Sequence, residues 1–365
     1  MGFTCGIVGL PNVGKSTLFN ALTASAQAEV ANYPFCTIDP NIGRIPVPDP
    51  RLERLRELSA CPVAVPAQLE VRDIAGLVRG ASHGEGLGNR FLAAIREVDA
   101  IFHLLRCFPD GEVSHVEGSL DPVRDLELVE TELLLADLES LERQAEGWIK
   151  KARGGVPEAR ARLALIDRLR AALEAGIPAR SVPLDAEEQI LVRHLHLLTA
   201  KPVLILCNVE EEAVAAGNRW SEQVAKAARA RGAPVLVISA KIEAELAALE
   251  PEERREYLES LGLAEPGLNR VLREGYRLLG LITFFTAGPK EARAWTVPRG
   301  TTAVEAAGRI HSDFARGFIR AEVIAYEDYV ALGGEAGARE AGRMRLEGRD
   351  YRIQDGDVCR FRFNV

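Results

Sequence analysis

Short apolar runs alternate with helix-like stretches over most of the chain. The runs that have the length of single strands are Phe3 to Val8, Ala67 to Val71, Ala100 to Leu105, Val203 to Cys207 and Val235 to Ile238. Apolar runs of this length are typical of parallel strands that are buried on both faces of a sheet. Because helical patterns lie between them, the sequence predicts an α/β fold with a doubly wound, mainly parallel sheet.

The alternation stops between about residues 121 and 200, where the pattern is helical throughout. The seam of a coiled coil is given by spacings of four and three between Leu134, Leu138, Leu141, Ala145 and Trp148. The segment Gly154 to Pro157 would break this helix, and a return helix has the matching stripe Leu163, Ile166, Leu169 and Leu173. A capping box from Asp185 to Glu188 would open a third helix. We therefore predict an inserted helical hairpin, which we call the arm.

From about Leu281 the pattern changes to short strand-like pieces around one helix. The strand-like pieces are residues 294–297, 322–325 and 358–363, and the helix lies near residues 302–311. This arrangement predicts a small α+β domain. The predicted division of the chain is 1–120 with 201–280 for the sheet domain, 121–200 for the arm and 281–365 for the C-terminal domain.

Composition narrows the class of protein. A chain of 365 residues with 47% hydrophobic residues can build two or three cores. Its six cysteines show no zinc-ligand spacing and no run of about 18 apolar residues occurs, so we expect a reduced, cytoplasmic protein without a membrane span. The net charge of -8 argues against attraction of nucleic acid to the whole surface, so RNA would bind only at local patches.

A phosphate-binding motif lies between the first predicted strand and the first predicted helix. Residues Gly9 to Thr17 read G-L-P-N-V-G-K-S-T, which matches G-x-x-x-x-G-K-[ST]. Its glycines allow backbone N–H groups to face phosphates, Lys15 can reach the β and γ oxygens of a nucleotide, and Ser16 can bind Mg²⁺. The residues expected to contact the nucleotide here are Asn12, Val13, Gly14, Lys15, Ser16 and Thr17. The motif predicts a nucleoside triphosphate with Mg²⁺ as the ligand.

Two further segments offer the remaining magnesium ligands. Asp73-Ile74-Ala75-Gly76 is a D-x-x-G motif at the end of a strand, in which Asp73 would hold Mg²⁺ through water and Gly76 would sense the γ-phosphate. Thr37, in the sequence P-F-C-T, is the expected second hydroxyl ligand. An ordinary turn stabilised by the threonine hydroxyl is the alternative at that position. The expected metal ligands are Ser16, Thr37 and Asp73.

The glycine-rich stretch after Asp73 carries the clearest resemblance to a known family. Residues Gly76 to Leu92 read G-L-V-R-G-A-S-H-G-E-G-L-G-N-R-F-L. Together with G-L-P-N-V-G-K-S-T, this stretch resembles the YchF branch of the Obg-like family of P-loop GTPases. The resemblance covers essentially the whole chain, and it implies that residues 281–365 form a TGS domain, a β-grasp module associated with contact to RNA or the ribosome.

The residue that follows Gly76 bears on catalysis. Ras-like hydrolases place a glutamine there to orient water, whereas this chain has Leu77, whose apolar side chain cannot do so. The resemblance implies two substitutes: Asn12 would help to bind K⁺ near the phosphates, and His115 would swing toward the γ-phosphate. His83 is the reserve candidate, and a purely structural role is the alternative for His115. The expected catalytic residues are Asn12, Lys15 and His115.

A motif after the predicted strand at residues 203–207 bears on the choice of base. GTPases read guanine with N-K-x-D, but this chain has Asn208-Val209-Glu210-Glu211. Val209 replaces the lysine that stacks on the base, and the longer side chain of Glu211 cannot occupy the plane of the aspartate without adjustment of the backbone. YchF-type proteins share this pattern and favour ATP, so the resemblance and the chemistry agree. The residues expected near the base are Asn208, Val209, Glu211, Ser239, Ala240 and Lys241.

The favoured function is a regulatory switch on the ribosome or on RNA that hydrolyses ATP, with GTP as a second substrate. A GTP-preferring, translation-associated GTPase is the alternative, followed by a metabolic P-loop kinase and by a scaffold that hydrolyses almost nothing. We expect a monomer whose arm tip and TGS domain contact ribosomal RNA or tRNA. From Arg143 to Arg170 the arm has eight basic and three acidic residues, although the solvated surface of an ordinary coiled coil is the alternative interpretation.

Overall fold

The structure is a computed structural model that describes residues 3–30, 41–74, 87–109, 119–229 and 231–364. It contains two compact units. The first comprises Met1–Arg44 and Glu70–Val271, and the second comprises Ile45–Leu69 and Leu272–Val365. No helix in the described ranges is long and apolar enough to cross a membrane.

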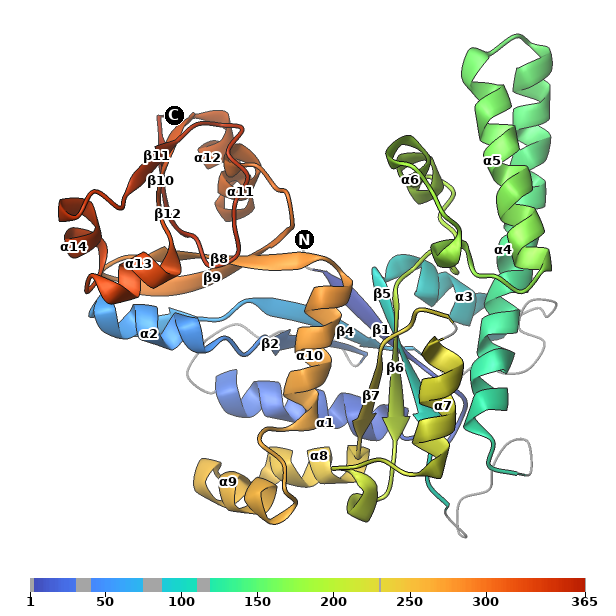
Figure 1. The fold of residues 1–365 in the computed structure, drawn as a ribbon, viewed down its shortest axis with the longest axis horizontal. Helices are drawn as coiled ribbons and strands as arrows, with labels where there is room; N and C mark the ends of the chain where they lie inside the picture. Colours follow the sequence, from blue (N-terminus) through green and yellow to red (C-terminus); the bar gives the residue numbers. More distant parts are fainter. Residues whose placement is uncertain (1–2, 31–40, 75–86, 110–118, 230, 365) are drawn as a thin grey trace. The chain divides into compact units, whose positions relative to one another are not determined.

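Five strands of the first sheet correspond to the apolar runs that the sequence predicts to be strands, and the sixth, at residues 42–46, was not predicted (Figure 1). Its strand order is β2 (Ile42–Pro46), β4 (Gln68–Asp73), β1 (Thr4–Val8), β5 (Ala100–Arg106), β6 (Val203–Asn208) and β7 (Val235–Ile238). The pairs β4–β1, β1–β5, β5–β6 and β6–β7 are all parallel. Every residue of β1, β5 and β6 is buried, as expected for strands that are covered on both faces. The predicted mainly parallel sheet is confirmed.

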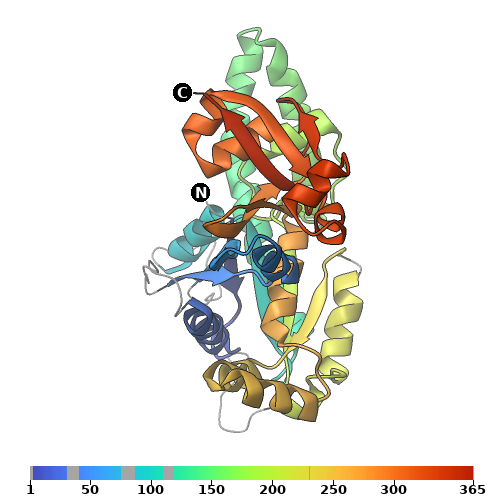
Figure 2. The ribbon, with the colours of Figure 1, turned by 90° about the vertical axis from the view of Figure 1, so that its left-hand side faces the viewer.

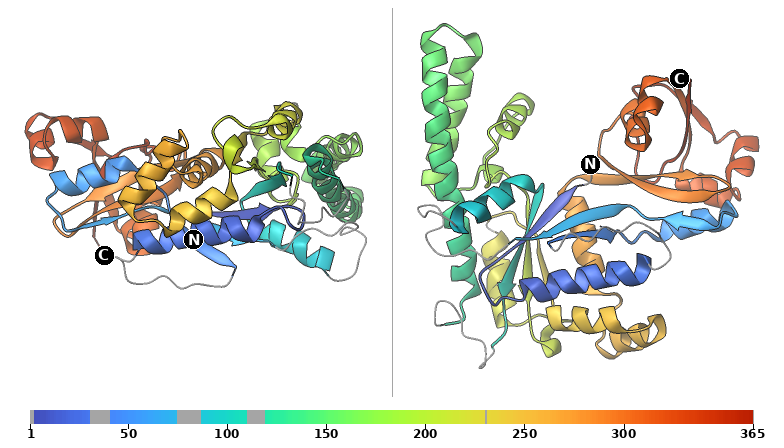
Figure 3. Two further views of the ribbon diagram at one scale, coloured as in Figure 1. Left: turned by 90° about the horizontal axis from the view of Figure 1, so that it is seen from below. Right: turned by 180° about the vertical axis from the view of Figure 1, so that it is seen from behind.

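Helices connect these strands and cover the sheet. They are α1 (Lys15–Val30), α3 (Leu87–Glu97), α7 (Arg219–Arg229), α8 (Ala240–Ala248), α9 (Pro251–Ser260) and α10 (Gly267–Leu278), with the short 3-10 helix η2 (Glu211–Ala213). Helix α1 packs against α8, and the two lie side by side in Figure 3, while α7 packs against β6 and β7. The loops after β1, β4, β6 and β7 thus leave one edge of a parallel sheet, which is where ligands bind in such folds.

The predicted arm is present as a helical hairpin. It consists of α4 (Pro122–Arg153), α5 (Pro157–Glu174), the 3-10 helix η1 (Ala179–Ser181) and α6 (Ala186–Arg193). Asp121 caps α4 through the backbone N–H of Arg124, and the chain reverses at Gly155, whose φ of 80° suits glycine. Buried Leu141, Ile166 and Leu169 form the seam between α4 and α5. The first turns of α4 lie beside the sheet, whereas its far end projects away from the sheet together with α5 (Figure 1).

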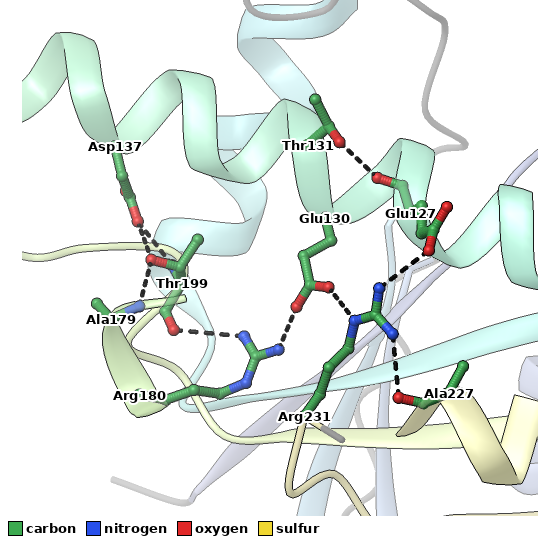
Figure 4. Close-up of polar contacts among 9 residues, drawn as sticks. All are labelled: Glu127, Glu130, Thr131, Asp137, Ala179, Arg180, Thr199, Ala227 and Arg231. Atoms are coloured by element: carbon green, nitrogen blue, oxygen red, sulfur yellow. Dashed lines mark hydrogen bonds and ion pairs between the residues drawn. The ribbon is translucent and has the colours of Figure 1, made fainter. Parts of the chain in front are cut away.

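Asp137 fastens α4 to the segment that returns from the arm (Figure 4). Its side chain is 1% exposed and accepts hydrogen bonds from the backbone N–H of Leu198 (2.8 Å), the backbone N–H of Thr199 (2.8 Å) and the Thr199 hydroxyl (2.6 Å). A buried carboxylate with three donors is stabilised against the cost of its burial. The root of the arm is therefore held by specific polar contacts as well as by apolar packing.

Glu130 makes a second contact about two turns earlier on α4 (Figure 4). One carboxylate oxygen pairs with Arg180, and the other accepts from Nε of Arg231 at 2.8 Å. His103 of β5 lines a small cavity of about 20 Å³ with these three residues, and its Nε2 atom has no partner. Burial, followed by the charge of Arg180, lowers the pKa of His103 to about 3, so the imidazole is neutral at physiological pH.

The second unit is α+β, as predicted. Its sheet has the order β11 (Arg345–Glu347), β10 (Phe318–Ile324), β12 (Val358–Phe363), β8 (Leu281–Ala287), β9 (Glu291–Pro298) and β3 (Val63–Val65). The associated helices are α2 (Pro50–Leu58), α11 (Ala303–Ile310), α12 (Ser312–Arg316), α13 (Tyr326–Ala331) and α14 (Glu335–Glu340). In Figure 2 the red and orange strands of this sheet face the viewer. Phe284, Val297, Val323 and Phe361 are part of the core beneath it.

One segment corrects the predicted boundaries. Residues 45–69 were assigned to the sheet domain, but by their contacts they belong to the second unit, where β3 pairs in parallel with β9. Arg51 bridges Asp49 and Asp355 at 2.7 and 2.8 Å, and the Ser59 hydroxyl lies 2.9 Å from that of Tyr329. A three-residue strand carries too few positions to show a periodic pattern, which is why the sequence did not reveal it. The arm falls within the first unit, so its status as a separate domain stays a prediction.

Candidate functional site

The loop between β1 and α1 has the backbone that the phosphate-binding motif requires. Asn12 and Gly14 have φ values of 63° and 98°, which turn successive peptide groups toward the inside of the loop. A Cβ atom on Gly14 would lie 2.6 Å from Nδ2 of Asn208, so a glycine is needed for packing as well. The carbonyl of Gly14 accepts from the N–H of Leu18, which begins the helical ladder of α1.

Lys15 is folded back onto this loop. Its ammonium donates to the carbonyl oxygen of Leu10 at 2.7 Å, and the residue is only 9% exposed. Burial lowers the pKa of Lys15 from its ordinary value, and the nearby charge of Asp73 opposes this change. A buried cation that is held by one neutral carbonyl is well placed to pair with an anionic ligand.

Asp73 and Ser16 lie together at the carboxyl end of β4. The Ser16 hydroxyl donates to Oδ2 of Asp73 at 3.4 Å, while Oδ1 of Asp73 is buried without a hydrogen-bond partner. Burial raises the pKa of Asp73, and Lys15 and Ser16 act in the opposite direction. An orphaned carboxylate oxygen beside a hydroxyl fits Mg²⁺, which takes one or two protein oxygens and completes its shell with water and phosphate. No group of three or more His, Cys, Asp or Glu side chains that could hold a metal occurs among the described residues.

A pocket of about 320 Å³ adjoins the phosphate-binding loop. It is lined by Gly14, Thr17, Phe108, Pro109, Asn208, Val209, Glu210, Glu211, Glu212, Ser239, Ala240 and Lys241. Asn208 joins its walls, because its Nδ2 donates to the carbonyl of Val13 (3.0 Å) and its Oδ1 accepts from the N–H of Ala240 (2.9 Å). Three segments that lie far apart in the sequence are thereby brought together, as their motifs predict.

Glu211 and Lys241 meet at the rim of this pocket. They form an ion pair between Oε1 of Glu211 and Nζ of Lys241, with 36% and 70% of the two side chains exposed. Val209 lines the pocket but is only 3% exposed, so it offers little surface for stacking. Phe108 is the aromatic residue among the described residues that line the pocket.

One residue that lines the pocket and one that supports its wall were not anticipated from the sequence. Phe108, just after β5, lies under the guanidinium of Arg106, whose carbon is 4.9 Å from the ring centre. Asn218 donates to the carbonyl of Cys107 (2.7 Å) and to Oε2 of Glu210 (2.9 Å), and so fixes two walls of the pocket. These residues belong to no motif, and only their positions after strands could have suggested them.

Some expected residues lie outside the described residues. They are Thr37, Gly76, Leu77, His83 and His115. Their roles stay predictions, as do the roles of the residues that line the site.

The fold and the site together define a class. The protein has a mainly parallel sheet, a G-x-x-x-x-G-K-[ST] loop with a buried lysine, and a pocket next to Asn208, which is bonded to that loop. These features define a P-loop nucleotide-binding protein of the GTPase class. A family model described as "50S ribosome-binding GTPase" matches residues 4–137. A second model, for the C-terminal domain of YchF GTPases and described as a protein of unknown function, matches residues 281–364.

Similarity to known proteins extends over the whole chain. The ribosome-binding ATPase YchF of Haemophilus influenzae is 54% identical over 365 residues, and that of Bacillus subtilis is 53% identical over 367 residues, with 100% of both chains covered in each case. The solved structure of the Schizosaccharomyces pombe YchF GTPase matches with a TM-score of 0.90 at 39% identity, covering 99% of this chain and 98% of that one. The chain belongs to the YchF family, a branch of the P-loop GTPases.

Proposed function

We propose that this protein is a Mg²⁺-dependent nucleoside triphosphatase that hydrolyses ATP to ADP and phosphate and acts as a regulatory switch on the ribosome. The observation that carries the proposal is the geometry of Lys15, Ser16 and Asp73, a buried ammonium beside an orphaned carboxylate oxygen and a hydroxyl. These groups suit a nucleotide triphosphate with its metal better than a neutral ligand.

In the proposed mechanism, Lys15 leaves the carbonyl of Leu10 and pairs with the β and γ oxygens of the nucleotide. Ser16, Thr37 and Asp73 would hold Mg²⁺, which would neutralise charge on the phosphates. Water attacks the γ-phosphorus and the bond to the β,γ-bridging oxygen breaks, so that ADP leaves with this oxygen and the proton lost by the water passes to an oxygen of the released phosphate. Gly76 would contact the γ-phosphate through its N–H group.

Leu77 cannot orient the attacking water, so we assign that role to His115, with His83 in reserve. Asn12 would help to bind K⁺, whose positive charge offsets the charge that develops between the phosphates. Stimulation of hydrolysis by K⁺ relative to Na⁺ tests that assignment. A rate indifferent to His115→Ala would pass the role to His83, to an ion or to the partner.

Two features support ATP as the substrate. Proteins at 53–54% identity are named ribosome-binding ATPases. In addition, Glu211 replaces the shorter aspartate of the guanine-reading motif, and adenine presents no pair of donors to a carboxylate at that edge. GTP remains the alternative substrate, because the matching family model and the S. pombe relative are both named GTPases.

The arm tip is the proposed contact with ribosomal RNA. Trp148 contacts two cations, with Nζ of Lys151 4.0 Å and the guanidinium carbon of Arg162 4.4 Å from its ring centre. Ile149 and Val156 expose 41% and 40% of their surface nearby. Clustered cations gain affinity for phosphates through counterion release, and flat rings can stack on bases. The TGS domain is the second proposed contact, and the protein would act as a cytoplasmic monomer.

Single-turnover hydrolysis with and without ribosomes tests the proposed function. We expect slow, Mg²⁺-dependent release of phosphate from ATP that rises when ribosomes are added. Faster hydrolysis and tighter binding of GTP would establish the GTPase alternative. Phosphate transfer to a small molecule instead of water would establish a kinase, and the absence of hydrolysis under both conditions would refute enzymatic turnover.

A further inference from the structure

The choice between adenine and guanine depends on which hydrogen-bonding groups of the pocket are free. Guanine presents the acceptor O6 and the donors N1–H and N2–H₂ along one edge, whereas adenine presents the donor N6–H₂ and the acceptor N1. A free carboxylate would favour guanine by accepting from N1–H and N2–H₂, and a free N–H would favour it by donating to O6. The ammonium of a lysine can donate to guanine O6 as well as to adenine N1, so its own N–H donors do not select the base.

Both groups that could favour guanine are already engaged within this protein. The carboxylate of Glu211 is paired with the ammonium of Lys241. The N–H of Ala240 donates to Oδ1 of Asn208 at 2.9 Å. Guanine would have to displace two internal contacts before it could be read in the manner of a GTPase.

Lys241 also changes the charge of the pocket. Three successive acidic residues, Glu210 to Glu212, line it, and Lys241 is the only cationic side chain among its described lining residues. Glu210 is engaged by Asn218 through a hydrogen bond of 2.9 Å. Glu211 therefore has Lys241 as its cationic partner within the pocket.

We propose that Lys241 is a specificity-determining residue, which selects against guanine by holding the carboxylate of Glu211 in an ion pair, so that this carboxylate cannot accept from guanine N1–H and N2–H₂. This inference rests on the proposed function as an ATPase. The choice of base would then depend on the pair of Glu211 and Lys241 and not on the motif at residues 208–211 alone. Lys241 lies on a separate segment, after β7.

The exposure of the pair makes the inference easy to test. With 70% of the Lys241 side chain exposed, the ion pair contributes little to folding, so its removal leaves the fold intact. A competing role is contact with the ribose or phosphates. That contact would be the same for ATP and GTP, so its loss would weaken both nucleotides by the same factor.

The experiment is titration of the full-length protein with ATP and with GTP in the presence of Mg²⁺. Lys241→Met keeps the apolar stem and removes the charge, Lys241→Arg keeps the charge, and Lys226→Met is a matched control at an exposed position on α7 that does not line the pocket. We expect Lys241→Met to lower the ratio of ATP to GTP affinity about tenfold, mainly through tighter GTP binding, with Lys241→Arg and Lys226→Met close to the unaltered protein.

A second variant removes the acceptor that Lys241→Met is expected to free. Adding Glu211→Gln to Lys241→Met should weaken GTP binding again, because an amide has only one acceptor oxygen. If the unaltered protein prefers ATP and its ratio changes by less than about twofold in Lys241→Met, the inference is wrong while the proposed function stands. If the unaltered protein prefers GTP, the proposed ATP preference itself fails.

Discussion

Replacement of Asp137 by alanine tests how the arm is fastened to the nucleotide-binding unit. The carboxylate accepts hydrogen bonds of 2.8, 2.8 and 2.6 Å from Leu198 N–H, Thr199 N–H and the Thr199 hydroxyl. Thr199 is fully buried, and its hydroxyl oxygen in turn accepts from the N–H of Ala179 at 3.2 Å. The substitution would leave two N–H groups and one hydroxyl without their acceptor in a region that water does not reach.

The size of the effect follows from these contacts. A hydrogen bond to a charged group contributes about 1.5–3 kcal/mol, so three give about 4.5–9 kcal/mol before other terms. The alanine variant no longer buries a charge, and this gain offsets part of the loss. Removal of one partner from a buried charged network typically costs about 3–5 kcal/mol, and we expect the free energy of unfolding to fall by that amount. The unfolding temperature of a unit of 150–250 residues would fall by about 6–20 °C.

Urea and thermal unfolding, followed by circular dichroism, measure this change. Asp137→Asn should show a smaller loss, because the amide keeps one acceptor oxygen but faces one of the donors with its NH₂ group. Glu139→Ala is the matched control on the same helix: its side chain is 60% exposed and pairs only with Arg143 at 3.8 Å, so we expect a change within about 0.5 kcal/mol. Asp137 does not line the nucleotide pocket, so ATP affinity at low temperature should be unchanged. A loss below about 1 kcal/mol for Asp137→Ala would refute the reasoning.

Three further predictions concern the ligand and the partner. Burial lowers the pKa of Lys15, so its positive charge is present below that pKa and is lost as the pH rises through it. ATP affinity should therefore begin to fall at a pH below the ordinary lysine pKa of 10.5. Titrations of Lys15→Met at the same pH values should show no such fall. Glu211→Asp should narrow or reverse the preference for ATP by about 1–3 kcal/mol, because the shorter carboxylate restores the guanine-reading geometry; an unchanged preference in comparative titrations would contradict this. Replacing Lys150, Lys151 and Arg153 together by Glu should weaken ribosome binding and flatten its salt dependence at constant ATP affinity, and unchanged cosedimentation across a salt series would leave the arm tip without a role in RNA binding.

The parts of the fold that repeat a pattern were predictable from the sequence. The buried strands are visible in the sequence as apolar runs. The arm is visible as a coiled-coil seam from Leu134 to Trp148 that is followed by a helix break at Gly154 and Gly155. The partners of Asp137 could not be predicted, because a hydrogen bond to a residue 61 positions away leaves no local pattern. The same holds for β3, whose three residues find their partner strand far along the chain.

The parts of the site that belong to sequence motifs were predictable, because a motif fixes the backbone geometry. The pocket residues that belong to no motif were not predictable. Gly14 and Asn208 belong to motifs, and the structure brings them into contact. Phe108 and Asn218 belong to none: Phe108 lines the pocket just after β5, and Asn218, just before α7, holds the pocket residue Glu210. The pairing of Lys241 with Glu211 was also not predictable, because the two residues belong to separate motifs on separate segments.

Residues 45–69 are synthesised long before the rest of the second unit, to which they belong. They leave the ribosome before the first residue of their main partner region, Leu272, which is made about 200 residues later. At 5–20 residues per second this interval is about 10–40 s. During that time Leu52 and Leu55, which are almost fully buried in the finished protein, have no completed sheet to cover them. The second unit can therefore assemble only after the residues from Leu272 onward have been made, and until then its first-made helix and strand expose apolar side chains that can aggregate.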